Sequence, residues 1–239
     1  MHSAMRTQGP FGPRTLVITT AAVLLTGWVV HAVALHKQLA VAKKDPLTGL
    51  LRRDAYNARA HRLLTRHGDD TTVVMVDADR FKQINDVMGH AAGDAVLAMM
   101  GARLTAWAGP GAAVGRLGGD EFAIVLELPA HRRVFRLEQL VLMLHTSVTL
   151  DDGRTVDVAA SVGAAAPASV GSRELTVLQR AADAALYDGK HSGRAVLATA
   201  QHRTVPSLNG RRAGRSGTSV GGPTVPVITA TNTTRETSK

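Results

Sequence analysis

Apolar and polar residues follow a pattern along the chain that divides it into three main parts. Residues 15–35 form an almost unbroken apolar run, residues 45–198 mix short apolar runs with amphipathic stretches, and residues 199–239 are dominated by Gly, Ser, Thr, Pro and Arg. A helix over the first part is about 30 Å long, the thickness of a bilayer core, which predicts a transmembrane helix. The last part holds too few large apolar residues to offset the entropy lost on folding, so we expect a disordered basic tail.

Within residues 45–198, hydrophobic periodicity predicts an α/β domain. Apolar residues recur at helical spacing, which predicts helices within 45–67, 94–107, 131–145 and 175–190. Short β-type runs predict strands at 71–76, 147–150, 155–160 and 195–198, with a hairpin across 113–126. On the helix at 131–145, the predicted inward face consists of Val134, Leu137, Val141 and Leu144. Strands that alternate with helices predict a sheet with helices packed against it.

The centre of the predicted hairpin carries the first chemical signal. Gly118 and Gly119 fit a tight turn between two strands, and Asp120 and Glu121 follow directly. Glycines let a ligand approach the main chain, and carboxylates bind hard cations. Asp77 ends the strand at 71–76 and is a second carboxylate that would share a metal with Asp120. The pattern favours a nucleotide–metal site, and a solvated surface turn is the alternative.

An ordered set of motifs resembles the GGDEF family of diguanylate cyclases. The matching blocks are Asp45-Pro-Leu-Thr-Gly-Leu50, Asp77-Ala-Asp-Arg-Phe-Lys82, Asn85-Asp86, Gly89-His90, Gly93-Asp94, Arg116-Leu-Gly-Gly-Asp-Glu-Phe122, Ser161-Val-Gly163 and the segment around Lys190 and Arg194. They occur in the family's order across 45–198. The resemblance implies a nucleotidyl-cyclase, ferredoxin-like palm fold with a βααββαβ core and a mainly antiparallel sheet, preceded here by one transmembrane helix.

The resemblance also implies a reaction and a metal. Two GTP would condense to cyclic di-GMP with release of two pyrophosphates, at the interface of a head-to-tail homodimer. The implied metal is Mg²⁺, with Mn²⁺ as a second candidate, held by Asp77, Asp120 and the backbone carbonyl of Ala78. The implied catalytic residues are Asp120, as proton acceptor, Glu121 and Lys82, which would neutralise charge on the phosphates.

The resemblance further implies a set of residues that bind GTP. The set consists of Asn85, His90, Asp94, Arg116, Gly118, Gly119, Lys190 and Arg194. Asn85 and Asp94 match the guanine-reading positions, and Lys190 and Arg194 match phosphate clamps. For these two cations, a basic helix end favoured by the helix dipole is the alternative interpretation.

The chain departs from the family pattern at a few positions. Where the family carries an Arg-x-x-Asp product-inhibition motif, this chain reads Gly109-Pro-Gly-Ala112, without a charge. We therefore expect no tight product inhibition at this face. Arg52 stands where Asn is common, and Gly189 and Ala195 replace a more usual Ala and Asn.

Composition and charge limit the kinds of metal site and binding partner that the chain can have. The formal net charge is +9 and the sequence pI is about 10.8, but aromatic residues make up only 3% of the chain and there is no cysteine. Disulfides and thiolate metal sites are therefore impossible. Because the basic residues form no dense run with interleaved aromatics, we expect no nucleic-acid binding.

The N-terminal residues, 1–44, determine whether the protein is attached to a membrane. Residues 1–14 are polar, residues 15–35 are the predicted span, and residues 36–44 are expected to continue it as a linker helix towards a dimer partner. A cleaved signal peptide is the alternative, although its apolar region would be longer than usual. The slight excess of Lys after the span agrees with a single-pass anchor in the cell membrane and a cytoplasmic catalytic domain.

Three functional hypotheses follow. The first is an active, membrane-anchored diguanylate cyclase, and the second is a non-catalytic GGDEF module that binds GTP or docks a partner. The third is a basic protein that binds membranes or nucleic acids, which leaves the ordered motifs unexplained. Because Asp77, Asp120 and Glu121 are all present, the sequence favours the first.

Overall fold

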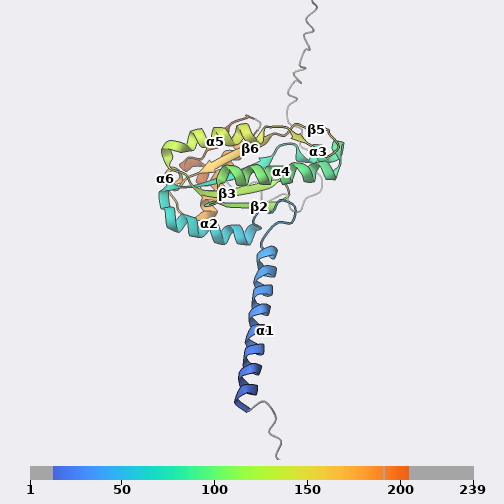
Figure 1. The fold of residues 1–239 in the computed structure, drawn as a ribbon. Helices are drawn as coiled ribbons and strands as arrows, with labels where there is room; N and C mark the ends of the chain where they lie inside the picture. Colours follow the sequence, from blue (N-terminus) through green and yellow to red (C-terminus); the bar gives the residue numbers. More distant parts are fainter. Residues whose placement is uncertain (1–12, 191, 205–239) are drawn as a thin grey trace, which may run out of the picture. The chain divides into compact units, whose positions relative to one another are not determined.

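A single long helix precedes the folded domain in the computed structural model, which describes residues 13–190 and 192–204. Helix α1 runs unbroken from Pro13 to Ala42 and covers both the predicted span and most of the predicted linker (Figure 1). It contains one segment long and apolar enough to cross a membrane, Val17–Leu35, none of which is buried against the protein. Most of the predicted N-terminal segment and tail lie outside the described residues.

The domain is built on a five-stranded sheet of order β2-β3-β1-β6-β7. The strands are β1 Thr71–Ala78, β2 Ala113–Gly118, β3 Glu121–Glu127, β6 Ala160–Ala165 and β7 Ala195–Leu197. The central strand, β1, pairs antiparallel with β3 and β6, whereas β7 pairs parallel with β6. A separate ribbon joins β4 Val148–Thr149 to β5 Thr155–Val156.

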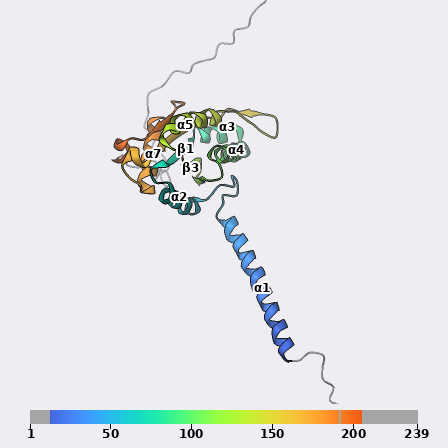
Figure 2. The same cartoon turned by 60° about the vertical axis from the view of Figure 1, so that its left-hand side comes forward.

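Helices cover both faces of this sheet (Figures 1 and 2). One face carries α4 His90–Ala108 and α5 Ala130–Leu144, and the other carries α2 Arg53–His67 and α7 Leu175–Asp188. Shorter helices are α3 Phe81–Met88, α6 Pro167–Val170, η1 Gly68–Asp70 and η2 Ala200–Thr204. Because side chains alternate along a strand, β1 sends Val74 and Val76 into one core and Val73 and Met75 into the other. This explains why β1 reads as a continuous apolar run.

A glycine on β6 sets the position of α7. A Cβ at Gly163 would collide with the backbone carbonyl oxygen of Ala182 and the backbone nitrogen of Leu186, both on α7. Only glycine therefore allows the helix backbone to lie directly on this strand. The close contact fixes where the last turn of α7, and Lys190 beyond it, meet the end of β1.

The predicted fold is confirmed. The order β1-α3-α4-β2-β3-α5-β6 is the expected βααββαβ core, with four antiparallel strands and one parallel edge strand. The largest boundary differences are that α4 begins at His90 rather than at residue 94, and that the apolar strand predicted at 155–160 is split between the ribbon and β6. Hydrophobic periodicity did not predict α3, although the core implied by the resemblance includes a helix at this place.

One predicted core position is wrong. Val134 is 63% exposed, and its neighbour Arg133 is buried in its place. The guanidinium of Arg133 donates hydrogen bonds to the Thr72 hydroxyl and to the carbonyls of Leu128 and Asp69. A buried cation is tolerated when its donors are satisfied in this way, which hydrophobic periodicity does not reveal.

The start of the predicted tail is also ordered, contrary to expectation. Residues Ala200–Thr204 form the 3₁₀ helix η2. His202 Nδ1 accepts a hydrogen bond from the backbone N–H of Thr199, and His202 Nε2 lies 3.1 Å from Asp188 Oδ2. Polar contacts rather than apolar burial therefore hold this turn. Residues 205–239 lie outside the described residues.

Replacing Gly163 by Ala is expected to destabilise the domain by about 1–3 kcal/mol, because either α7 or β6 must move to admit the methyl group. Chemical unfolding followed by circular dichroism measures the change. Gly111→Ala is the matched control, since a Cβ there meets nothing within 4 Å. Equal midpoints for the two variants would contradict the proposed packing role.

Candidate active site

The β2–β3 hairpin ends in a two-residue turn. Gly118 pairs with Glu121, which leaves Gly119 and Asp120 as the turn residues. Gly119 has a φ of +48°, a conformation that glycine adopts without strain. A Cβ added at Gly118 or at Gly119 would meet nothing within 4 Å. The backbone of the turn is therefore bare on the side that a ligand would approach.

Strand pairing brings the predicted metal ligands together. Asp77, at the end of β1, is the direct partner of Glu121 on β3. The Ala78 N–H donates a 3.2 Å hydrogen bond to the backbone carbonyl of Asp120. Asp77, the Ala78 backbone and Asp120 thus meet at one end of the sheet, and their oxygens are the ligand type that hard divalent cations prefer.

Only two carboxylates belong to this predicted ligand set. In the described part of the chain, no group of three or more His, Cys, Asp or Glu side chains is arranged to hold a metal. The third predicted ligand, the Ala78 carbonyl, is a backbone group. The donor chemistry fits Mg²⁺, which keeps several waters or substrate oxygens and needs few protein ligands.

Negative charge is concentrated around the turn. The pKa of Glu121 is raised, first by burial and then by the nearby carboxylates of Asp77, Asp183 and Asp120, and Arg53 partly opposes this shift. Asp183 lies buried on α7 and was not among the predicted site residues. The signal for it was a single acid within the alanine-rich run of that helix. Such a concentration of carboxylates favours cation binding.

A lysine already compensates part of this charge. The ammonium nitrogen of Lys190 donates a 2.8 Å hydrogen bond to Asp77 Oδ1. The predicted phosphate clamp therefore lies on a predicted metal ligand. Arg194, the second predicted clamp, is exposed, and its guanidinium makes no hydrogen bond or ion pair to any residue that the structure describes.

The predicted guanine-reading residues lie together where α3 meets α4. A Cβ at Gly93 would collide with the side-chain oxygen of Asn85, so the glycine makes room for that amide. Asp94 follows Gly93 and is exposed. Lys82 and His90 are also exposed, on α3 and at the start of α4. The structure therefore brings Asn85 and Asp94 to one place, and leaves Lys82 and His90 accessible to a ligand.

Arg116 ties the turn to the start of the domain. Its Nε donates to the carbonyl of Gly119 at 2.9 Å, and its Nη1 lies 3.1 Å from Asp45 Oδ1. Asp45 also accepts from the backbone N–H and the hydroxyl of Thr48. Arg53, which the sequence did not single out, donates to the carbonyl of Leu117 at 2.9 Å. Arg116 thus holds the hairpin to the segment before α2, and Arg53 holds it to the first residue of α2.

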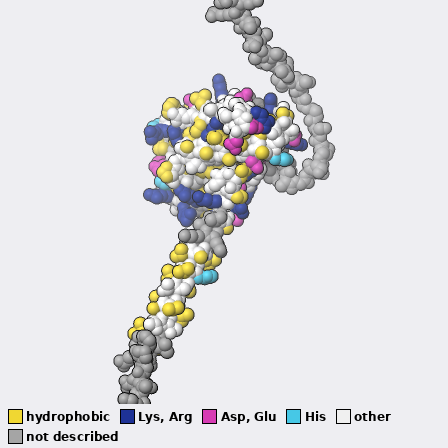
Figure 3. Space-filling model, turned by 45° about the vertical axis from the view of Figure 1, so that its right-hand side comes forward, with side chains coloured by type: hydrophobic (Ala, Val, Ile, Leu, Met, Phe, Trp, Pro, Cys, Tyr) yellow, Lys and Arg dark blue, Asp and Glu magenta, His cyan; other side chains and the backbone are white. Residues whose placement is uncertain are grey.

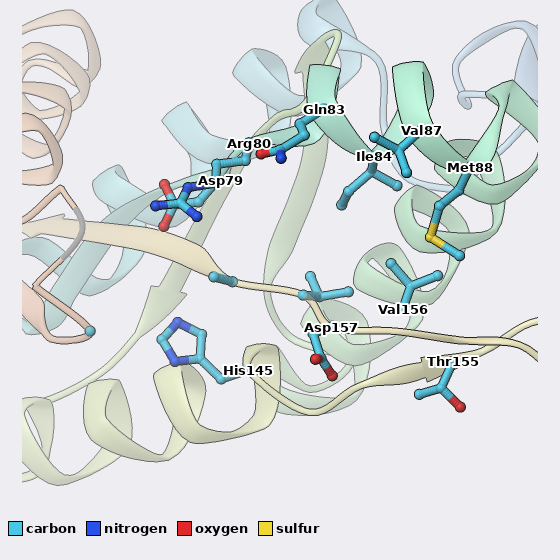
Figure 4. A pocket seen from close by; sticks show the side chains of 13 residues that line it. Asp79, Arg80, Gln83, Ile84, Val87, Met88, His145, Thr155, Val156 and Asp157 are labelled. Carbon is cyan, nitrogen blue, oxygen red and sulfur yellow. The ribbon is translucent and has the colours of Figure 1, made fainter. Parts of the chain in front are cut away.

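A groove of about 590 Å³ lies on the opposite side of α3 (Figure 4). Gln83, Ile84 and Val87 line it from α3, and Val156 points towards them from β5. Asp79 lines one end and accepts a 2.8 Å hydrogen bond from the Ser161 hydroxyl. The groove contains none of the predicted GTP-binding residues.

Comparison with known proteins assigns this arrangement to a family. Residues 42–196 match the family described as diguanylate cyclase, GGDEF domain. The chain belongs to the GGDEF family of diguanylate cyclases. A Streptomyces ambofaciens relative, described as an uncharacterized 19.3 kDa protein in repSA 5'region, is 43% identical over 73% of this chain and 94% of its own length. The Pseudomonas aeruginosa diguanylate cyclase TpbB is 34% identical over 64% of this chain, which spans only 36% of TpbB.

Solved structures agree with the GGDEF fold. The isolated GGDEF domain of TpbB has a TM-score of 0.60 at 33% identity and covers 66% of this chain and 96% of its own. The coiled coil and GGDEF domain of DgcB from Caulobacter crescentus, in complex with c-di-GMP, has a TM-score of 0.67 at 23% identity, over 76% of this chain and 99% of its own. The second likeness concerns the fold alone. The family match and the relatives support a diguanylate cyclase. The solved structures agree with its palm-like mixed sheet.

Asp45 is expected to make the domain's stability depend on pH. Burial raises the pKa of Asp45, but hydrogen bonds from Thr48 and Arg116 and the Arg116 charge outweigh burial and lower it overall. A lowered folded-state pKa contributes stability above the unfolded value of about 3.9, and this stability is lost as the pH falls through the folded-state pKa. Asp45→Asn should therefore cost about 1–2 kcal/mol at pH 7 and little at pH 3.

Unfolding free energies measured from pH 7 to pH 3 test this expectation. Asp54→Asn, an exposed acid on α2, is the control for removing one carboxylate. If the deficit of Asp45→Asn against wild type is the same at both ends of the pH range, the ionised carboxylate is not the stabilising group.

Proposed function

We propose that this GGDEF protein is an active, Mg²⁺-dependent enzyme that condenses two GTP to cyclic di-GMP and two pyrophosphates. The observation that carries the proposal is the meeting of Asp77, the Ala78 backbone and Asp120 beside the bare glycine turn. An inactive module would not need this concentration of carboxylates, in which burial and then the neighbouring negative charges raise the pKa of Glu121. The alternative of a non-catalytic module has no comparable observation in its favour.

In the proposed mechanism, Asp77, Asp120 and the Ala78 carbonyl would hold the metal. Bound there, Mg²⁺ supplies positive charge to the phosphates and makes the attacking hydroxyl more acidic. Asp120 accepts the proton of the 3′-hydroxyl of one GTP. The 3′-oxygen forms a bond to the α-phosphorus of the other GTP, and the bond from that phosphorus to pyrophosphate breaks. Lys82, Lys190 and Arg194 offset the charge that develops on the phosphate oxygens.

Specificity for guanine is proposed to rest on the α3–α4 junction. The Asp94 carboxylate accepts hydrogen bonds from guanine N1–H and N2–H, and the Asn85 amide bonds beside it. Adenine lacks this pair of donors, so an adenine nucleotide would leave the carboxylate unpaired. His90 lies near the nucleotide, Gly118 and Gly119 let it approach the main chain, and Arg116 holds the turn against it.

Each half-site holds one GTP, so two copies of the chain must meet for reaction. We propose that α1 anchors the protein in the cell membrane through Val17–Leu35, with the catalytic domain in the cytoplasm where GTP is present. Confining two copies to one plane raises their effective concentration and favours their encounter. The apolar length of the span and the lysines that follow it support this proposal.

The first test is Asp120→Asn in the full chain, assayed with GTP and Mg²⁺ for cyclic di-GMP. Loss of a charged ligand and of the proton acceptor should lower turnover by at least about 100-fold. Asp86→Asn is the control, because Asp86 is an exposed acid on α3 outside the proposed site. Near-normal turnover in a folded Asp120→Asn variant would refute the assignment.

The second test concerns Lys190, whose ammonium group occupies Asp77 Oδ1. A divalent cation that binds without nucleotide has to displace this ammonium, whereas the phosphates of GTP would draw it away. Lys190→Gln should therefore bind Mn²⁺ about tenfold more tightly than wild type in the absence of nucleotide, yet bind GTP more weakly.

Electron paramagnetic resonance of free Mn²⁺ measures the first affinity, and the exposed Arg194→Gln is the matched control. That variant should weaken GTP binding and leave nucleotide-free Mn²⁺ binding unchanged. Unaltered Mn²⁺ affinity in Lys190→Gln would show that the lysine does not compete for the metal ligand.

A further inference from the structure

Four cations meet where the chain passes from α1 into the domain. The backbone N–H of Arg52 donates to the carbonyl of Lys43, and its Nε donates to the carbonyl of Lys44, each at 2.9 Å. An antiparallel bridge between Lys44 and Leu51 closes the same loop. Residues separated by eight positions are thereby joined, and Arg53 follows as the first residue of α2. We call Lys43, Lys44, Arg52 and Arg53 the cationic loop.

The cationic loop forms no ion pair within the described residues, although the Arg53 charge acts on the pKa of Glu121. All four side chains are exposed. The two guanidinium groups donate only to backbone carbonyls, Arg52 to Lys44 and Arg53 to Leu117. Figure 3 shows Lys and Arg side chains gathered on the domain surface around the point where the chain enters it. The loop therefore presents a local excess of positive charge.

The sequence distance to the apolar span places this charge near a membrane surface. Helix α1 continues from Leu35, the last residue of the span, to Ala42, directly before the loop. The seven helical residues after Leu35 rise about 10 Å. The headgroup layer on one side of a bilayer is about 5–8 Å thick, and the Debye length at physiological salt is about 8 Å. The cationic loop thus lies within electrostatic reach of the lipid phosphates.

We propose that the cationic loop binds the anionic headgroups of the membrane that α1 crosses. This rests on the proposed anchoring and not on the proposed catalysis. Isolated lysines after a span serve mainly to orient it, but here loop closure adds two arginines from eight residues further along the chain. Lysine offers a point charge and arginine a planar fork for phosphate, and clusters of this size bind anionic lipid surfaces.

Binding at this loop also reaches the candidate active site. Arg53 donates to the carbonyl of Leu117, which directly precedes Gly118 of the turn. The backbone N–H of Arg116 donates to the carbonyl of Leu51, inside the closed loop. Lipid contact at the cationic loop would therefore hold the hairpin end of the domain close to the membrane surface.

The experiment uses the full chain in nanodiscs made of phosphatidylcholine alone or with phosphatidylglycerol. Because the chain has no cysteine, Ala58→Cys on the exposed face of α2 gives a unique site for a donor dye, and the acceptor dye is carried by lipid headgroups. We expect stronger energy transfer in the anionic discs. Lys43→Gln with Lys44→Gln should remove at least half of this difference.

Arg132→Gln with Arg180→Gln is the matched control, since it removes the same charge from exposed positions on α5 and α7. This control should behave as wild type. Equal transfer in the two disc types, or an equal loss in control and test variants, would overturn the proposal. So would abolition of the difference by millimolar glycerol phosphate, which would indicate a site for small anions. A chain that is not retained in the discs would instead refute the anchoring, and cyclase activity is not part of the readout.

Discussion

Repulsion between carboxylates at the end of β1 is the constraint on which the site depends. Asp77 and Glu121 are direct partners on the adjacent strands β1 and β3, and Asp120 and Asp183 add negative charge nearby. Partly buried like charges of this kind are unfavourable unless cations accompany them. Lys190 supplies one, at 2.8 Å from Asp77, and its position follows from the contact of α7 with β6 at Gly163. Gly163 therefore contributes indirectly to charge compensation, because it lets α7 lie where Lys190 reaches Asp77.

The sequence predicted the parts of the fold that depend on local pattern. The apolar run that becomes β1, the glycine turn and the acids at the strand ends each carry their signal within a few residues, because strand and turn formation are local. The resemblance then implied that Asp77 and Asp120 share a metal, and the strand register places Asp77 opposite Glu121, the residue after Asp120. Periodicity alone missed α3, because its eight residues span only about two turns, whereas the core implied by the resemblance includes it.

Contacts between distant residues were the part that the sequence did not predict. Lys190 lies on Asp77, 113 residues away, and Arg53 lies on Leu117, 64 residues away. Arg133 occupies a core position because carbonyls from other elements satisfy its guanidinium, so its burial is decided by tertiary structure. Hydrophobic periodicity describes the spacing of apolar residues along the chain. It does not indicate which polar groups form hydrogen bonds with distant residues.

The uncharged window at Gly109–Ala112 illustrates how neighbouring cations are already engaged. Arg59 donates to the carbonyl of Pro110, and Arg136 donates to the carbonyl of Trp107 while stacking 4.9 Å from the centre of its ring. A guanidinium carries five N–H donors, so a bond to one carbonyl engages the group without using all its donors. These arginines hold backbone around the window, and none of them stands within Gly109–Ala112, where the family carries its Arg-x-x-Asp motif.

Helix α3 carries two of the proposed GTP-binding and catalytic residues, yet none of its residues is fully buried. It holds Lys82 and Asn85, follows Arg80, which has a left-handed conformation with φ of 57°, and packs mainly against α4. Its other side borders the groove, where Val87 is 76% exposed. An element with so little burial opens at low free energy, so a nucleotide that bridges Asn85 on α3 and Asp94 on α4 would stabilise the helix it binds. The proposed recognition of guanine would therefore be coupled to the ordering of α3.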